Sequence, residues 1–130
     1  MENVNNKILG LQHIGLPTAD VQKTVDFYTL FGFEIEWERL DPPAERVAFL
    51  KNGSCVIETY CCTEPAMANG AVDHISLDVS DIEAVFEYAH INGYASLEGK
   101  ITDLPFYSKG VRYFTILGPN HEKLEFNQKL

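Results

Sequence analysis

The sequence predicts an α+β fold made of two copies of one β-α-β-β-β module, and three observations lead to this prediction. The run that begins at His13 is repeated at His74, 74 − 13 = 61 residues later, and the register holds without a gap for 21 residues. In each copy an apolar run is followed by a helical pattern and then by three strand-like runs. A chain of 130 residues that is 45% hydrophobic can bury one core. We expect a single domain over residues 1–130, with modules at about 8–62 and 72–128 and a linker at 63–71.

The paired positions of the repeat are of matching character. Each copy has a histidine in its first strand, an aspartate before its helix and a glycine after it. Because an internal repeat of this kind fixes the architecture, it has to be considered before any single motif. The pairs are His13/His74, Ile14/Ile75, Leu16/Leu77, Asp20/Asp81, Val21/Ile82, Phe27/Tyr88, Gly32/Gly93 and Phe33/Tyr94.

The first module is expected to begin with a strand over residues 8–16 that a turn ends at Pro17. Asp20 can accept hydrogen bonds from the unpaired amides of the helix that follows, and Gly32 is suited to end that helix. The apolar side chains in between recur at helical spacing. They are Val21, Val25, Phe27, Tyr28 and Phe31.

Three strands are expected to complete the first module, at residues 33–39, 46–50 and 54–62. Asn52-Gly53 is a hairpin signal between the last two. Alternation places Phe33, Ile35 and Trp37 on one face of the first of these strands. In the last strand the shared face carries Ser54, Val56, Glu58, Tyr60 and Cys62.

The second module repeats this plan. A strand over residues 72–79 leads into a helix through Ile91, for which Ser80 and Glu83 form a capping box, and Gly93 ends it. The expected strands after it are 94–101, 111–117 and 123–127, with a long loop at 102–110 and a turn at 118–121.

Charge and composition exclude several classes of protein. The formal net charge of −9 argues against nucleic acid and against anionic membrane surfaces as partners. The N-terminal residues lack the features of signal and transit peptides, and no apolar run approaches a membrane span. Three cysteines, Cys55, Cys61 and Cys62, lack metal-ligand spacing and are expected to be reduced thiols. We expect a cytoplasmic protein.

Each module offers one histidine in its first strand and one glutamate in its last, namely His13 with Glu58 and His74 with Glu125. A single strand histidine is more often a satisfied core residue, and a single strand glutamate is more often solvated. The repeat reverses these odds, because approximate twofold symmetry would bring all four side chains together. Two imidazoles and two carboxylates suit a divalent ion with two open positions: Ni²⁺ or Co²⁺ above all, with Zn²⁺, Mn²⁺ or Fe²⁺ as alternatives.

Four runs carry a family resemblance over residues 8–127. The sequence resembles the vicinal oxygen chelate superfamily (glyoxalase I, bleomycin resistance proteins, dioxygenases), and most closely the small glyoxalase I type lyases. In the last of the four runs, Gly118 stands for the family's Asp and His121 for its Gly. The runs are Leu11-Gln12-His13-Ile14-Gly15, Val56-Ile57-Glu58-Thr59, Val72-Asp73-His74-Ile75 and Gly118-Pro119-Asn120-His121-Glu122-Lys123-Leu124-Glu125-Phe126.

The resemblance implies a cup-shaped, partly open β-barrel in which His13, Glu58, His74 and Glu125 bind the metal. It implies a lyase that isomerises the hemithioacetal of a 2-oxoaldehyde to a 2-hydroxyacyl thioester through an enediolate. Glu125 and Glu58 would then be the catalytic acid and base.

The small-molecule substrate is less well defined by the sequence. Pro17 and Cys62 stand where the small glyoxalase I enzymes have an Arg and an Asn for glutathione, so glutathione is disfavoured. Lys109 and Arg112, beside Tyr107, could hold an anionic end of a substrate, or could be solvated loop charges. Cys62 could line the pocket, or could be a small buried filler.

Two other functions and two assemblies stay open. The resemblance also covers acyl-CoA epimerases of the methylmalonyl-CoA type, which usually have Gln at the place of Glu58, and metal-free drug-binding modules of the bleomycin resistance type, which lose the ligands. A homodimer is expected, and the four ligands could come from one chain or from two.

Overall fold

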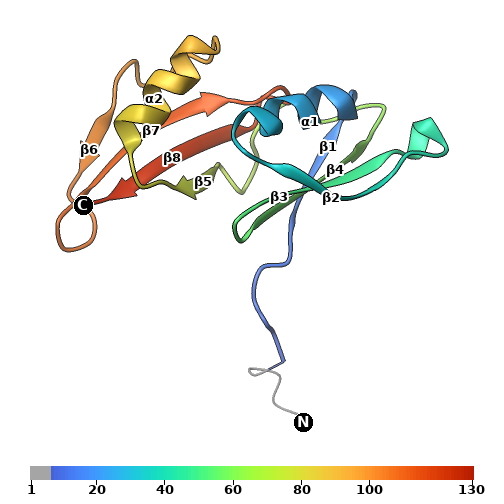
Figure 1. Ribbon diagram of the computed structural model, residues 1–130, viewed down its shortest axis with the longest axis horizontal. Helices are drawn as coiled ribbons and strands as arrows, with labels where there is room; N and C mark the ends of the chain where they lie inside the picture. Colours follow the sequence, from blue (N-terminus) through green and yellow to red (C-terminus); the bar gives the residue numbers. More distant parts are fainter. Residues whose placement is uncertain (1–6) are drawn as a thin grey trace. The chain divides into compact units, whose positions relative to one another are not determined.

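The computed structural model describes residues 7–130, and the chain divides into two compact units, Met1–Glu64 and Pro65–Leu130. Each unit holds one four-stranded sheet and one α-helix on a face of that sheet (Figure 1). The boundary between the units lies in the segment that the sequence assigns to the linker. The predicted α+β fold of two β-α-β-β-β modules is confirmed.

Unit 1 contains a sheet with the strand order β1-β4-β3-β2. Strand β1 runs parallel to β4, and the other neighbours are antiparallel, so the helix connects strands on opposite edges of the sheet. The elements are β1 (Ile14–Thr18), α1 (Val21–Leu30), β2 (Glu34–Arg39), the short 3₁₀ helix η1 (Pro43–Glu45), β3 (Val47–Asn52) and β4 (Cys55–Cys61).

Helix α1 forms the core of unit 1 together with β3 and β4. The Asp20 carboxylate accepts the backbone N–H of Lys23 at 3.1 Å at the start of the helix, and Gly32 takes a positive φ of +83° just beyond its end. The buried side chains of α1 recur at helical spacing and meet alternate residues of the two strands. They are Val21, Thr24, Val25, Phe27 and Tyr28 from the helix, and Ala48, Leu50, Ile57 and Thr59 from the strands.

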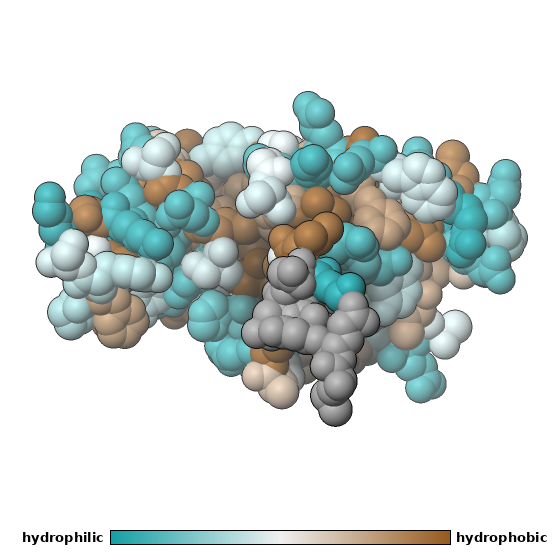
Figure 2. Space-filling view, turned by 90° about the horizontal axis from the view of Figure 1, so that it is seen from below, coloured by the Kyte–Doolittle hydropathy of each residue, from teal (hydrophilic) through white to brown (hydrophobic). Residues whose placement is uncertain are grey.

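Strand β1 is shorter than the sequence predicts. It begins at Ile14, which pairs with Ile57 of β4. Because the two strands are parallel and β4 starts at Cys55, β4 offers only two more residues before Ile57 with which an earlier part of β1 could pair. The hydrophobic side chains before β1 therefore lie outside the core, and Ile8, Leu9 and Leu11 are exposed. Figure 2 shows such hydrophobic surface residues interspersed with hydrophilic ones on the face seen there.

A β-bulge corrects the predicted pattern of β2. The pairing with β3 shifts between Ile35, which lies opposite Leu50, and Trp37, which lies opposite Phe49. Leu50 is fully buried on the side of α1, whereas Phe49 is half-buried on the other face. The prediction that Ile35 and Trp37 share one face is therefore wrong, because the extra residue of the bulge turns Trp37 over.

Unit 2 repeats the topology of unit 1, with the strand order β5-β8-β7-β6 and a parallel pair β5-β8. Its core lies between α2 and the inner face of β7 and β8, with Phe114, Ile116, Leu124 and Phe126 buried. The elements are β5 (Ile75–Asp78), α2 (Ile82–Ile91), β6 (Thr102–Leu104), β7 (Val111–Leu117) and β8 (Lys123–Lys129).

Helix α2 begins one residue later than the predicted capping box requires. Its N-cap is Asp81, whose carboxylate accepts the backbone N–H of Ala84 at 3.1 Å, as Asp20 does in unit 1. The carboxylate of Glu83 pairs with Arg112 instead of reaching back to Ser80. The capping box is therefore wrong, and the repeat was the better guide to this helix start.

The strand predicted at residues 94–101 is a loop, and β6 lies within the segment predicted as a loop. Leu97 N–H donates to the carbonyl of Thr115 at 2.8 Å, but the N–H of Thr115 is taken by the side chain of Glu98 at 2.7 Å. Gly99 turns the backbone away at a φ of +79°. A side chain thus replaces the strand carbonyl that a regular ladder would supply. Among the described residues, no helix is long and apolar enough to cross a membrane.

Candidate functional site

His13 and Glu58 lie side by side on the face of the first sheet that is turned away from α1. His13 directly precedes β1. Glu58 lies in β4 opposite Gly15, which is two residues after His13. Nε2 of His13 is 3.3 Å from Oε1 of Glu58. About a third of the His13 side chain (32%) and a quarter of the Glu58 side chain (26%) are exposed, so both remain accessible to a ligand.

Gly15 leaves the space between these strands open. A Cβ atom at this position would lie 3.9 Å from Oε1 of Glu58 and 3.8 Å from the ring of Tyr60. Glu58 and Tyr60 therefore share this face, as the alternation in the sequence predicts, while Ile57 and Thr59 are buried on the other.

His74 and Glu125 occupy the same places in unit 2. Glu125 lies in β8 opposite Ser76, which is again two residues beyond the histidine. Nε2 of His74 is 3.9 Å from Oε2 of Glu125. The repeat in the sequence is thus matched by the strand register, because each module places one imidazole next to one carboxylate.

The residue before each histidine holds the other ring nitrogen. Nδ1 of His13 is 3.0 Å from Oε1 of Gln12, and Nδ1 of His74 is 2.9 Å from Oδ2 of Asp73. The Asp73 carboxylate only accepts, so Nδ1 of neutral His74 carries the hydrogen and its lone pair lies on Nε2, on the side of Glu125. The amide of Gln12 holds an acceptor oxygen and a donor N–H on one carbon, so it can pair with either tautomer of His13. The hydrogen bond from His74 lowers the pKa of Asp73 below its ordinary value of 3.8, and the charge of Lys123 acts in the same direction.

A hollow of about 640 Å³ opens next to His74 and Glu125 in unit 2. Strands β5, β7 and β8 form its floor, and the loops around β6 form its wall. Its lining combines charged, aromatic, polar and aliphatic side chains. Among them are Asp73, Glu98, Phe106, Tyr107, Tyr113, Thr115, Lys123 and Asn127.

A hollow of about 550 Å³ lies next to His13 in unit 1. The β2 bulge supplies part of its lining, because it turns Trp37 onto this face. Trp37 and Phe49 contact each other with ring centroids 6.0 Å apart, and Phe49 meets the ring of His13 edge-on at 5.4 Å. The remaining lining residues are Gln12, Glu36 and Val56.

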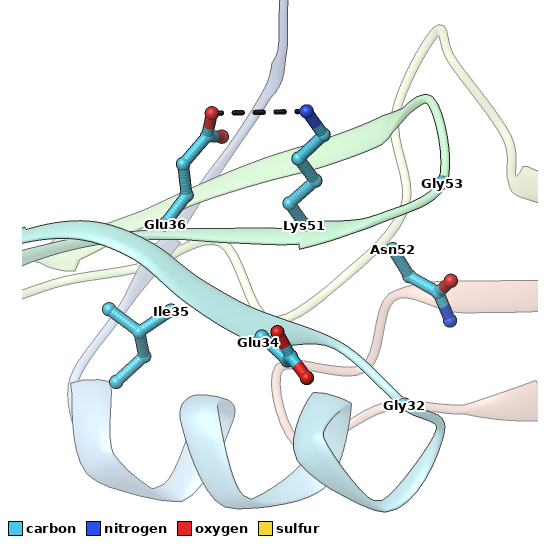
Figure 3. A pocket seen from close by; sticks show the side chains of 7 residues that line it. All are labelled: Gly32, Glu34, Ile35, Glu36, Lys51, Asn52 and Gly53. Carbon is cyan, nitrogen blue, oxygen red and sulfur yellow. Dashed lines mark ion pairs between the residues drawn. The ribbon is translucent and has the colours of Figure 1, made fainter.

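Another hollow in unit 1 lies where β2 and β3 approach the end of α1 (Figure 3). Glu36 and Lys51 point the same way off the sheet there, with 4.0 Å between the carboxylate and the ammonium group. Asn52 donates its side-chain N–H to the carbonyl of Phe31 at 2.9 Å and so caps α1. This hollow contains no predicted site residue.

The predicted substrate-binding residues separate into two groups. Tyr107 lines the hollow beside Glu125, and the ammonium group of Lys129 lies 4.3 Å from the centre of its ring. Arg112 is held by Glu83 of α2 at 3.0 Å and by Asp103 at 3.2 Å, and the hydrogen bond to Glu83 raises its pKa. The structure does not bring Arg112 to the lining of either histidine hollow, and the same is true of Lys109 and Cys62.

Sequence reasoning missed several residues of these hollows. Lys123 could have been found, because it lies two residues before Glu125 in the same strand. Gln12 and Asp73 could also have been found, because the repeat aligns them with each other and each directly precedes a site histidine. Glu98 belongs to a loop and gave no signal.

The donor chemistry fits a divalent cation. Each unit brings one imidazole nitrogen and one carboxylate oxygen together. Residues 7–130 include no group of three or more His, Cys, Asp and Glu side chains that could hold a metal. Each pair offers one nitrogen and one oxygen donor, which are ligand types that divalent transition metals accept.

Comparisons with known proteins agree with this architecture. The uncharacterized protein YwbC of Bacillus subtilis (strain 168) is 30% identical over 128 residues, which cover 92% of this chain and 97% of YwbC. A glyoxalase family protein from Enterococcus faecalis has a similar fold, with a TM-score of 0.76, 22% identity, and coverage of 93% of this chain and 98% of that one. A V278E mutant of glyoxalase I from Zea mays gives a TM-score of 0.72 at 18% identity, over 92% of this chain and 44% of the maize chain.

The family assignment rests on nearly the whole sequence. Residues 10–126 match one family, and this range contains both histidines, both glutamates and all but the end of the second sheet. The chain belongs to the Glyoxalase/Bleomycin resistance protein/Dioxygenase superfamily.

Proposed function

We propose that this protein is a metal-dependent lyase of the glyoxalase I type. The reaction would convert the hemithioacetal of a 2-oxoaldehyde to a 2-hydroxyacyl thioester. The observation that carries the proposal is the equal placement of His13 with Glu58 and of His74 with Glu125, each pair in the same strand register.

The four side chains would together hold one divalent cation, with Ni²⁺ or Co²⁺ preferred and Zn²⁺, Mn²⁺ or Fe²⁺ as alternatives. When bound, the ion would supply Lewis acidity to two neighbouring oxygens of the substrate. The placement of each Nε2 atom beside an accessible carboxylate supports this role. We further propose a homodimer, in which the two pairs come from one chain or from two.

The glutamates would move the proton. One carboxylate removes the proton from the carbon that carries sulfur, and the electron pair of the broken C–H bond moves into a double bond to the neighbouring carbon. The proton then returns to that neighbouring carbon, so the product is an isomer of the substrate. We assign the removal of the proton to Glu125, because its side chain lines the larger of the two histidine hollows. We assign the return of the proton to Glu58.

Glutathione is disfavoured as the thiol. Pro17 and Cys62 stand where related small enzymes hold glutathione, and Arg112 is engaged by Glu83 and Asp103. The assay therefore pairs methylglyoxal with glutathione, with cysteine and with a small neutral thiol. Epimerisation of an acyl-CoA is a second assay for the same enolate chemistry.

Elemental analysis and one substitution test the proposal. The protein, loaded with excess metal and then desalted, should retain one ion per chain, and one of the thiol assays should give turnover. Glu125→Gln should abolish turnover while keeping part of the metal, whereas Glu87→Gln, on an exposed face of α2, should change neither. Absence of bound metal in the wild type, or a fully active Glu125→Gln variant, would refute the proposal.

A further inference from the structure

We propose that Asp73 is a positioning residue that orients His74 for metal binding and makes the second module the tighter-binding half of the site. This inference rests on the proposed function, since it concerns the same metal. It goes beyond that function because it predicts unequal contributions from two halves whose ligands are identical.

The contact between Asp73 and His74 sets the state of the ring. Oδ2 of Asp73 lies 2.9 Å from Nδ1 of His74, and the carboxylate can only accept. The hydrogen therefore sits on Nδ1, and the Nε2 lone pair lies on the side of Glu125, whose Oε2 is 3.9 Å away. A histidine fixed in this way meets a metal without first changing its tautomer or its ring orientation.

Two further donors hold the Asp73 carboxylate in place. Its Oδ1 accepts from Nδ2 of Asn69 at 2.7 Å and from Nζ of Lys123 at 3.4 Å. Lys123 lies in β8 two residues before Glu125, so the carboxylate is tied to the strand that carries the other ligand. This matters because about half of the Asp73 side chain is exposed, and an exposed pair without such support would be mobile.

In the first module, the residue before the histidine forms a weaker hydrogen bond to the ring. Gln12 stands where Asp73 stands in the repeat, and its amide oxygen lies 3.0 Å from Nδ1 of His13. A neutral amide makes a weaker hydrogen bond than a carboxylate, by a factor of about two. A charged partner also raises the basicity of the imidazole, and a neutral amide does not. The two histidines therefore differ in their support although their own geometry is alike.

Metal affinity in three variants tests this difference. Asp73→Asn keeps the size of the side chain and an acceptor oxygen but removes the charge, and it should weaken Zn²⁺ binding about 10- to 100-fold in competition with a chelating indicator. Gln12→Ala should weaken binding less than Asp73→Asn does. Asp78→Asn is the matched control: it removes one negative charge from β5, the strand that follows His74, without touching the ring, and it should leave affinity within about twofold.

A measurement on the metal-free protein separates this inference from the proposed function. At about pH 8, long-range ¹H–¹⁵N correlation spectra report which nitrogen of each neutral imidazole carries the hydrogen. The wild type should show His74 with hydrogen on Nδ1. Asp73→Asn, which a cooperative urea transition should show to be folded, should give a mixture, because an amide can turn either its oxygen or its N–H toward Nδ1. If the wild type binds no metal, the proposed function fails, and the spectra still decide the positioning role. An unchanged His74 tautomer in Asp73→Asn, or a loss of affinity equal to that of Asp78→Asn, would overturn the inference.

Discussion

The carboxylate of Glu98 accepts the backbone N–H of Thr115 at 2.7 Å, in place of the backbone carbonyl that a neighbouring strand would provide beside β7. Thr115 pairs with Glu125 in the sheet, and both Glu98 and Thr115 line the hollow at His74. A loop side chain thus completes the ladder next to a proposed catalytic residue.

Removing this acceptor should destabilise unit 2. Glu98→Ala leaves the largely buried N–H of Thr115 without its partner, which costs about 1–3 kcal/mol of unfolding free energy. Glu98→Gln keeps a carbonyl oxygen at the same place and should cost less than about 1 kcal/mol. Urea denaturation measures both, with Glu87→Ala as a surface control. Equal losses for the Ala and Gln variants would show that the hydrogen bond is not what holds the loop.

The carboxylate of Glu122 fills the space beside Gly118. A Cβ atom at residue 118 would run into the Glu122 carboxylate, which is nearly buried and accepts the N–H of Asn120 at 2.8 Å. Gly118→Ala should therefore cost about 1–3 kcal/mol of unfolding free energy, as overpacking does in other well-packed sites. The loss should be smaller when the same substitution is made in a Glu122→Ala background. A double-mutant cycle measures this coupling, and strict additivity would contradict the steric explanation.

The reactivity of Cys55 should depend on the fold. Burial raises the pKa of the Cys55 thiol above its ordinary value of 9.0. The thiolate is the form that reacts, so at any pH below the raised pKa the folded protein carries less of it than the unfolded protein does. Iodoacetamide should alkylate Cys55 more slowly in buffer than in urea, and the midpoint of the rate against pH should lie higher in the folded protein. Peptide mass spectrometry follows the residue, and a lower midpoint in the folded state would contradict the prediction.

The sequence predicted those features that depend on a regular period. Alternation in β4 placed Glu58 with Val56 and Tyr60, and the repeat placed the two histidine–glutamate pairs at equal positions. These features follow from local patterning, which repeats every two residues in a strand.

Several features that escaped prediction interrupt a regular pattern. The bulge in β2 turned Trp37 onto the site face, and Glu98 took the place of a backbone acceptor. At His121, which stands for a glycine of the family motif, the backbone takes a positive φ of +59° while the ring lies 3.1 Å from the carbonyl of Met67. Each depends on a contact with a distant residue, and no local pattern encodes such a contact.

Trp37 should report binding at His13. It is the only tryptophan of the chain, it is 58% exposed, and Phe49 contacts both its indole and the ring of His13. A change at His13 therefore alters the surroundings of the only indole in the protein. Titration of metal-free protein with Zn²⁺ should change the emission of Trp37 and should saturate at one equivalent per chain.

Two variants establish where that signal comes from. Trp37→Phe should lose the signal but keep the metal in elemental analysis, because the indole supplies no ligand. His13→Ala removes a proposed ligand and should weaken binding by more than the 10- to 100-fold typical of losing a residue that only supports a ligand. If His13→Ala gave the same titration curve as the wild type, the ion would bind elsewhere. The proposed pairing of His13 with Glu58 as metal ligands would then be wrong.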